Sequence, residues 1–140
     1  MKLMRSAFLG LGLLLAVSAA QGQEPRVKAN IPFNFVVGDR VMPAGEYLVS
    51  QISTGSPAIA ILSEDRRANV LVITSACASS SPSKKTKLVF HALAGRYFLS
   101  QVWTEGYAQG RQLGMSKSEI ELAKNGSTSE DFVLAANLTR

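Results

Sequence analysis

The stretch Lys87–Trp103 reads KLVFHALAGRYFLSQVW, and it decides the fold because it predicts a β-hairpin. Apolar residues alternate on both sides of Ala94-Gly95, a pair that fits a two-residue turn. This turn implies three cross-strand pairs: Ala92 with Tyr97, Phe90 with Leu99, and Leu88 with Gln101. A longer loop with a bulge would shift the pairing by one residue. Both faces are largely apolar, so we expect the hairpin to be central and covered on both sides.

The N-terminal 20 residues have the layout of a secretory signal peptide. Lys2 and Arg5 precede an apolar run that ends at Val17, and small residues follow it. Cleavage is expected after Ala20, with positions 19 and 22 as alternatives, although a buried N-terminal helix would share this composition. The apolar run is shorter than the roughly 20 residues that span a bilayer. The sequence therefore predicts an exported protein, periplasmic or extracellular, without a transmembrane segment after cleavage.

The rest of the chain divides into a linker (21–26), one β-rich domain (27–136) and a tail (137–140). Removal of the signal peptide would lower the net charge from +5 to about +3, which is only mildly basic. The positive clusters Arg66-Arg67 and Lys84-Lys85 are not interleaved with aromatic residues, so we do not expect nucleic-acid binding. The partner is not identified by the sequence, and an envelope polymer, a protein and a small ligand are the candidates.

Several further segments have the length and alternation of strands, and turn residues separate them. The expected strands are Arg26–Val37 with a bulge or edge at Pro32, one from Tyr47 to Ile52, Ala58–Leu62 paired with Asn69–Ser75, a brief strand around Arg111–Leu113, and an edge strand Asp131–Ala136. Between them, Ala76–Lys85 is expected to be a flexible loop. The predicted fold class is all-β: an antiparallel sandwich or small barrel of about seven or eight strands with one short C-terminal helix.

Structural roles are expected for a few residues. Gly95 allows the hairpin turn, and Gly45 precedes Tyr47, whose hydroxyl is expected to bond back to upstream backbone as in a tyrosine corner. The helix is predicted at Ser116–Lys124, because Ser116 with Glu119 and Ser118 with Glu121 both fit a capping box and Asn125-Gly126 follows. We expect this helix to dock through Ile120 and Leu122, since two turns are marginal alone.

Motifs for catalysis, metals and cofactors are not found in the sequence. The chain has one histidine and one cysteine, Cys77, so it offers no His-pair metal site and no intramolecular disulfide. His91 as a base for Ser100 is the remaining catalytic candidate, and a structural histidine is the favoured interpretation. Cys77 is interpreted as a small residue tucked under a loop. We therefore predict no cofactor, no metal and no enzymatic activity.

The residues that suggest a binding site are Tyr97, Gln101 and Trp103, which share one parity of the hairpin. A core with one hydrogen-bonded amide is the simpler interpretation. Alternatively, an indole and a phenol on either side of an amide could line a cleft for a sugar or a small apolar ligand.

The segments IPFNFVVGDRVMPAGEYLV, KLVFHALAGRYFLSQVW and GRQLGMSKSEIELAK together give the pattern PF-x-F-x-VG, PAG-x-Y, LVFH, RYFLSQVW and GR-x-L. This set resembles a family of small exported bacterial proteins, common in soil bacteria, that has no assigned function. The resemblance covers most of the chain after the signal peptide and implies export and a β-rich domain. It implies no activity.

Three hypotheses for function follow. The first is an exported β-rich binding or interaction module without catalysis. The second is a lipocalin-like carrier with a cavity near Trp103, and the third, least favoured, is a hydrolase. A continuous cavity near Trp103 would favour the carrier, whereas a filled core would exclude it.

Overall fold

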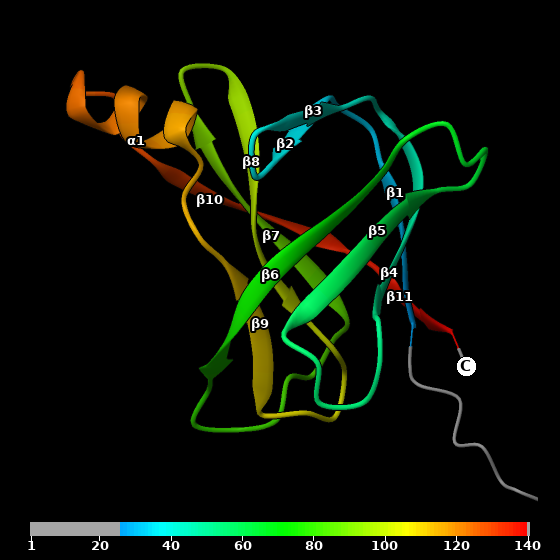
Figure 1. Ribbon diagram of the computed structural model, residues 1–140. Coiled ribbons are helices and arrows are strands. Elements are labelled where there is room, and N and C mark those ends of the chain that lie inside the picture. The colour runs from blue at the N-terminus through cyan, green and yellow to red at the C-terminus, as the bar shows by residue number, and fades with distance from the viewer. Residues whose placement is uncertain (1–25, 140) are drawn as a thin grey trace, which may run out of the picture.

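The computed structural model describes residues 26–139, which form 11 strands and one helix (Figure 1). The strands and the helix are β1 Arg26–Ile31, β2 Phe35–Val37, β3 Arg40–Met42, β4 Gly45–Gln51, β5 Ala58–Ser63, β6 Asn69–Ala78, β7 Lys87–Leu93, β8 Arg96–Trp103, β9 Gln109–Leu113, α1 Lys117–Lys124, β10 Glu130–Ala135 and β11 Asn137–Thr139. The fold is all-β with one short helix, as predicted. The predicted signal peptide lies outside the described residues.

All of these strands belong to one mixed sheet, in the order β10-β7-β8-β9-β6-β5-β4-β1-β11, with β2 on β8 and β3 on β2. Neighbours are antiparallel except β2 and β8, which are parallel. β6 joins the two halves, because Asn69–Ile73 pair with β5 and Thr74–Ala78 pair with β9. The sheet curls around a core without closing into a barrel.

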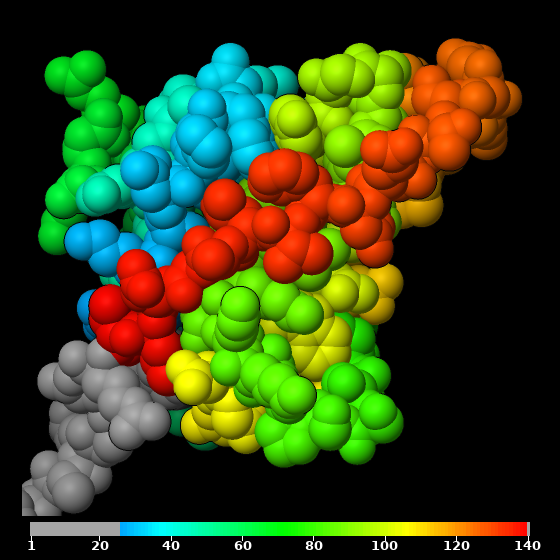
Figure 2. All heavy atoms as spheres, turned by 180° about the vertical axis from the view of Figure 1, so that it is seen from behind, coloured from blue at the N-terminus to red at the C-terminus, as the bar shows by residue number. Residues whose placement is uncertain are grey.

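The C-terminal segment supplies the strand at each end of the strand order. β10 pairs with β7 and β11 pairs with β1, and only Ala136 lies between them. Figure 2 shows this segment in red, crossing the face of the molecule between the halves. The predicted tail at 137–140 therefore contains a strand, and the last edge strand ends one residue earlier than predicted.

Buried side chains from both halves of the sheet form the main core. On β1 every second residue is buried, from Val27 to Ile31, because a strand alternates its faces. The core consists of Val27, Ala29, Ile31, Phe35, Val37, Met42, Tyr47, Val49, Ile59, Ile61, Leu88, Phe90, Leu99, Val102 and Leu113. This cluster is the larger of the two groups of buried apolar side chains, and their removal from water favours folding.

The central hairpin, β7 and β8, has the predicted two-residue turn. Ala94 and Gly95 both have positive φ, 48° and 75°, which fits a type I′ turn. Two predicted pairs are confirmed, Ala92 with Tyr97 and Phe90 with Leu99. The register then shifts between Val89 and Phe90, where Ser100 is the extra residue of a β-bulge.

The bulge makes the third predicted pair wrong. Gln101 lies opposite Val89, and Leu88 lies opposite Val102. Because one extra residue exchanges the two faces of a strand, Val102 enters the core and Gln101 and Trp103 point away from it.

The hairpin is covered on both faces near its turn, as predicted. One face belongs to the main core, and the other packs in a second cluster of Val36, Leu93 and Phe98 with Leu122 of α1. We call this end, which carries the turn and α1, the helix end. The opposite end carries the loops 52–57 and 104–108 (Figure 1).

The helix begins and ends where the sequence predicts. The hydroxyl of Ser116 accepts a hydrogen bond from the backbone N–H of Glu119 at 3.1 Å, and Asn125 is the C-cap. The predicted docking residue Ile120 is wrong, because it is 39% exposed, whereas the side chain of Glu119 is buried. A polar contact, described below, holds this face of the helix.

Two smaller differences concern the boundaries of strands and loops. Pro32 interrupts the first predicted strand, because its ring nitrogen cannot donate to a ladder, and β1 and β2 result. The predicted loop from Ala76 begins later, because pairing with β9 extends β6 to Ala78.

The Tyr47 hydroxyl donates a 2.6 Å hydrogen bond to the carbonyl of Pro43, the upstream bond expected from the sequence.

Candidate functional site

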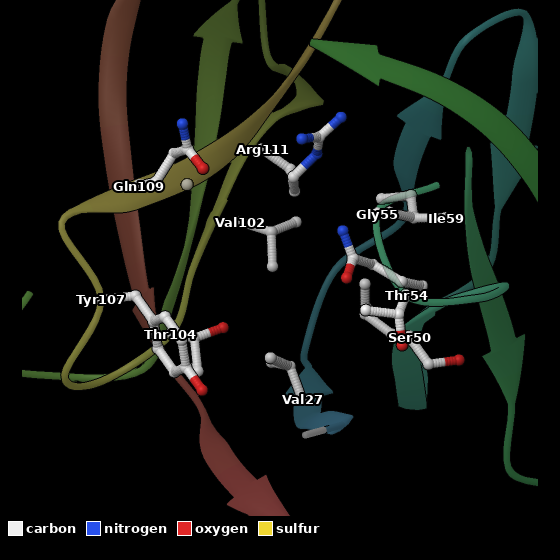
Figure 3. A pocket seen from close by; sticks show the side chains of 13 residues that line it. Val27, Ser50, Thr54, Gly55, Ile59, Val102, Thr104, Tyr107, Gln109 and Arg111 are labelled. Carbon is white, nitrogen blue, oxygen red and sulfur yellow. The ribbon is translucent and has the colours of Figure 1, made fainter. Parts of the chain in front are cut away.

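A pocket of about 520 Å³ opens at the end of the molecule opposite α1, which we call the pocket end. It lies between β4 and β5 on one side and β8 and β9 on the other, and Figure 3 shows side chains from both sides around it. The lining residues are Val27, Val49, Ser50, Gln51, Thr54, Gly55, Ile59, Val102, Thr104, Tyr107, Gln109, Gly110 and Arg111.

The inner surface of the pocket is aliphatic. Its buried members are core residues of four different strands, Val27, Val49, Ile59 and Val102. Each is the inward residue of its strand, and Val102 is inward because of the bulge at Ser100. The pocket is thus an unfilled end of the main core.

Polar groups surround this aliphatic surface. Thr54 and Thr104 contribute hydroxyls, and Gln109 and the half-exposed Tyr107 lie towards solvent. The amide of Gln51 donates a 3.4 Å hydrogen bond to the carbonyl of Ser56, within the loop that follows β4. Apolar walls with a few polar groups are typical of small-molecule sites.

Arg111 is the one charged residue among those that line the pocket. Its Nε donates to the Thr74 hydroxyl at 2.8 Å, and its Nη2 donates to the Thr74 carbonyl at 3.2 Å. Thr74 is itself fixed, because its hydroxyl donates to the carbonyl of Pro57 at 2.6 Å. In the part of the chain from 26 to 139, no acidic side chain forms an ion pair with Arg111.

Trp103 lies on the other side of the pocket wall. A Cβ added at Gly110 would lie 2.8 Å from two atoms of its ring, so the indole is packed directly on the backbone of β9. Its Nε1 donates a 2.9 Å hydrogen bond to the side-chain oxygen of Gln101. Gln101 thus has the hydrogen bond that the simpler interpretation of the sequence expected for its amide.

The structure therefore brings together two of the three predicted site residues, Gln101 and Trp103. Tyr97 lies elsewhere, stacked on Phe33 with ring centroids 3.9 Å apart and in edge contact with Phe132. None of the three lines the pocket. After the bulge Val102 is the inward residue, so Gln101 and Trp103 point away from the pocket, and Tyr97 lies before the bulge against Phe33.

Arg111 was not predicted as a site residue from the sequence. The signal was present, because Gln109, Arg111 and Leu113 share one parity of β9 and Leu113 is a core residue. A charged residue on the inward parity of a strand is uncommon unless it is paired or functional. The short predicted length of this strand concealed the pattern.

The candidate catalytic residue His91 is held between two carboxylates. Its Nδ1 lies 2.6 Å from the Glu119 carboxylate, and its Nε2 lies 3.7 Å from that of Asp131. Both ring nitrogens thus face acidic groups from α1 and β10. This arrangement joins the helix and the C-terminal segment to the hairpin, and it does not present His91 as a base to Ser100.

Cys77 lies on β6 opposite Gly110 and is half-buried. Burial raises the pKa of its thiol, and the backbone N–H of Gly110 and the charge of Arg111 oppose this effect more weakly. A raised pKa lowers the thiolate fraction, so Cys77 is a weak nucleophile at neutral pH. Residues 26–139 contain no group of three or more His, Cys, Asp or Glu side chains placed to hold a metal ion.

Comparison of the chain with protein-family models, curated proteins and solved structures finds no match. The family resemblance of the motifs therefore stays a prediction. No helix within the described range 26–139 has the length and hydropathy to cross a membrane.

Proposed function

We propose that the protein is an exported binding module without catalysis, and that it holds a small ligand in the pocket between β4–β5 and β8–β9. The observation that carries the proposal is the pocket itself: an aliphatic interior of about 520 Å³ with hydroxyl, amide and guanidinium groups around it. This volume lies within the range of about 300–1,000 Å³ that is usual for small-ligand sites.

The proposal combines the first two hypotheses from the sequence. It keeps a binding module and adds a cavity beside Trp103, as the carrier hypothesis required, but with different lining residues. The contact of His91 with Glu119 and Asp131 supports the absence of catalysis, because it gives the chain's one histidine a structural use. Export continues to be supported by the signal-peptide pattern alone.

The test is native mass spectrometry of the mature protein from a periplasmic extract. We expect a copurifying small molecule with the wild type. Val102→Phe should remove it, because the larger ring occupies the pocket, and Val49→Phe should do the same from the opposite wall. Val133→Phe is the matched control, since Val133 is 56% exposed on β10 and does not line the pocket.

Retention of the same mass by both pocket variants would show that the ligand binds elsewhere. A wild type that carries no ligand, and takes up none from a panel of small amphiphiles, would also overturn the proposal. Circular dichroism of each variant establishes that the sheet is intact.

A further inference from the structure

We infer that the ligand is a singly charged anion with an aliphatic body, a carboxylate in particular, and that Arg111 binds its head group. This inference rests on the proposed function and names the ligand class of the same pocket. Three observations lead to it: the charge of the pocket, the orientation of the guanidinium, and the composition of the inner surface.

The charge of the pocket comes from Arg111 alone among its lining residues. A half-buried guanidinium loses part of its hydration, and a negatively charged partner compensates for the free energy that this desolvation costs. The described residues supply no acidic partner, so the compensating charge has to come from a ligand or from bulk counterions. One cation balances one negative charge, which favours a monoanion over a phosphate dianion.

The guanidinium is also oriented before a ligand arrives. Two of the five N–H groups of the guanidinium donate to Thr74, one to its hydroxyl and one to its carbonyl. The Thr74 hydroxyl in turn donates to the carbonyl of Pro57. The remaining donors lie in the plane of the same fork. A planar fork is complementary to a carboxylate, which can accept two parallel hydrogen bonds. Prior orientation reduces the entropy that binding would otherwise cost.

The body of the ligand is indicated by the inner surface. Its buried residues, Val27, Val49, Ile59 and Val102, are all branched aliphatics. The one aromatic residue among the lining residues, Tyr107, is half-exposed. This surface gains free energy by burying methylene groups and has no aromatic platform in its interior on which a sugar ring could stack.

The experiment compares probes that share one aliphatic chain and differ in charge: octanoate, n-octanol, octylammonium and octyl phosphate. Binding to the mature protein is measured by calorimetry and by fluorescence of Trp103, the single tryptophan, whose ring packs on the pocket-lining Gly110. We expect octanoate to bind about ten- to one-hundred-fold more tightly than octanol. Octylammonium should bind more weakly than octanol.

Arg111→Met keeps an apolar stem and removes the charge and the donors. It should abolish the preference for octanoate while octanol binds as before. Arg111→Lys should lose about half of the preference, on a logarithmic scale, because it keeps the charge without the fork. Arg40→Met is the control, since Arg40 donates to the carbonyl of Asn69 at 2.8 Å but does not line the pocket.

Thr74→Val tests the positioning role of Thr74. It removes the hydroxyl that accepts from Arg111 Nε and keeps the carbonyl. We expect a several-fold fall in the ratio of octanoate to octanol affinity. The ratio is the informative quantity, because damage to the pocket as a whole would lower both affinities together.

The outcomes separate this inference from the proposed function. Equal binding of octanoate and octanol, unchanged in Arg111→Met, would overturn the anion assignment and leave a ligand-binding pocket. Octyl phosphate binding more than tenfold tighter than octanoate would overturn the monoanion assignment. Binding that survives Val102→Phe and Val49→Phe would place the probes outside the pocket and overturn both proposals.

Discussion

The helix end and the pocket end belong to the same hairpin but complete their packing differently. At the helix end, Val36, Leu93 and Phe98 pack with Leu122, and Glu119 of α1 contacts His91. At the pocket end no strand or helix among residues 26–139 fills the space between the halves of the sheet, and the guanidinium of Arg111 donates to Thr74. One end is held by protein partners, whereas the other leaves groups that a ligand can use.

The difference teaches that a single bulge can assign the two ends of one strand pair to different tasks. Before Ser100, Tyr97 and Leu99 of β8 face the main core, and Phe98 faces the second cluster on the other side of the sheet. After Ser100, Val102 is the inward residue and forms part of the pocket wall. Bulges are frequent beside functional sites because they redirect side chains in this way.

The largest expected effect is a difference in stability between Leu93→Ala and Ile59→Ala. Both residues are only 2% exposed. Leu93 lies in the packed cluster at the helix end, so its truncation leaves a new cavity and should cost about 3–4 kcal/mol. Ile59 already borders the pocket, so its truncation enlarges an existing space and should cost about 2 kcal/mol. Urea denaturation measures both values, and equal costs would contradict the contrast between the ends.

The second effect concerns the wall between Trp103 and the pocket. Gly110→Ala would place a Cβ 2.8 Å from the indole ring and 2.9 Å from the Val102 carbonyl oxygen. The strand or the indole must move, at a cost of about 2–3 kcal/mol, and the emission of Trp103 should shift. Gly114→Ala is the control, because a Cβ there has no atom within 4 Å. If both variants behave alike, the close packing of Trp103 on β9 is wrong.

The third effect tests the contact that holds α1. Glu119→Ala removes the carboxylate 2.6 Å from His91 and should cost about 1–2 kcal/mol, a low value for a charged hydrogen bond because the His91 side chain is 30% exposed. Hydrogen exchange of the α1 amides should accelerate more than that of β8. Glu121→Ala is the matched control on the exposed face of the same helix. Unchanged exchange in Glu119→Ala would show that Leu122 alone docks the helix.

Local patterns predicted much of this fold from the sequence. The turn at Ala94-Gly95, the cap at Ser116 and the alternation of β1 depend on residues close together in the chain, and the structure has all three. The docking of α1 was predicted only in part: Leu122 packs as expected, but the contact of the buried Glu119 with His91, 28 residues away, was not foreseen. Such a pairing has no local signature.

The site was less predictable for the same reason. The sequence grouped three residues by their shared parity on one strand: Tyr97, Gln101 and Trp103. A bulge breaks this parity, and no single residue type predicts a bulge. Arg111 was recognisable as an inward charge on β9. Its position in a pocket depends on the distance between the two halves of a curled sheet, and this distance cannot be predicted from the sequence of either strand.

The smallest effect concerns Glu64 and Glu46, two carboxyl groups that do not line the pocket and that are unfavourable partners for each other. Glu64, in the turn after β5, has a raised pKa because it shares a hydrogen bond with Glu46 and is repelled by its charge. Since the folded-state pKa is the higher one, this contribution to stability is complete below the unfolded-state pKa and is lost as the pH rises through the folded-state pKa. Glu64→Gln should therefore raise the Tm slightly at pH 7 and leave it unchanged at pH 3, whereas Glu105→Gln, at the exposed surface of the pocket end, should show no such difference. An equal change at both pH values would contradict the unfavourable contact between Glu64 and Glu46.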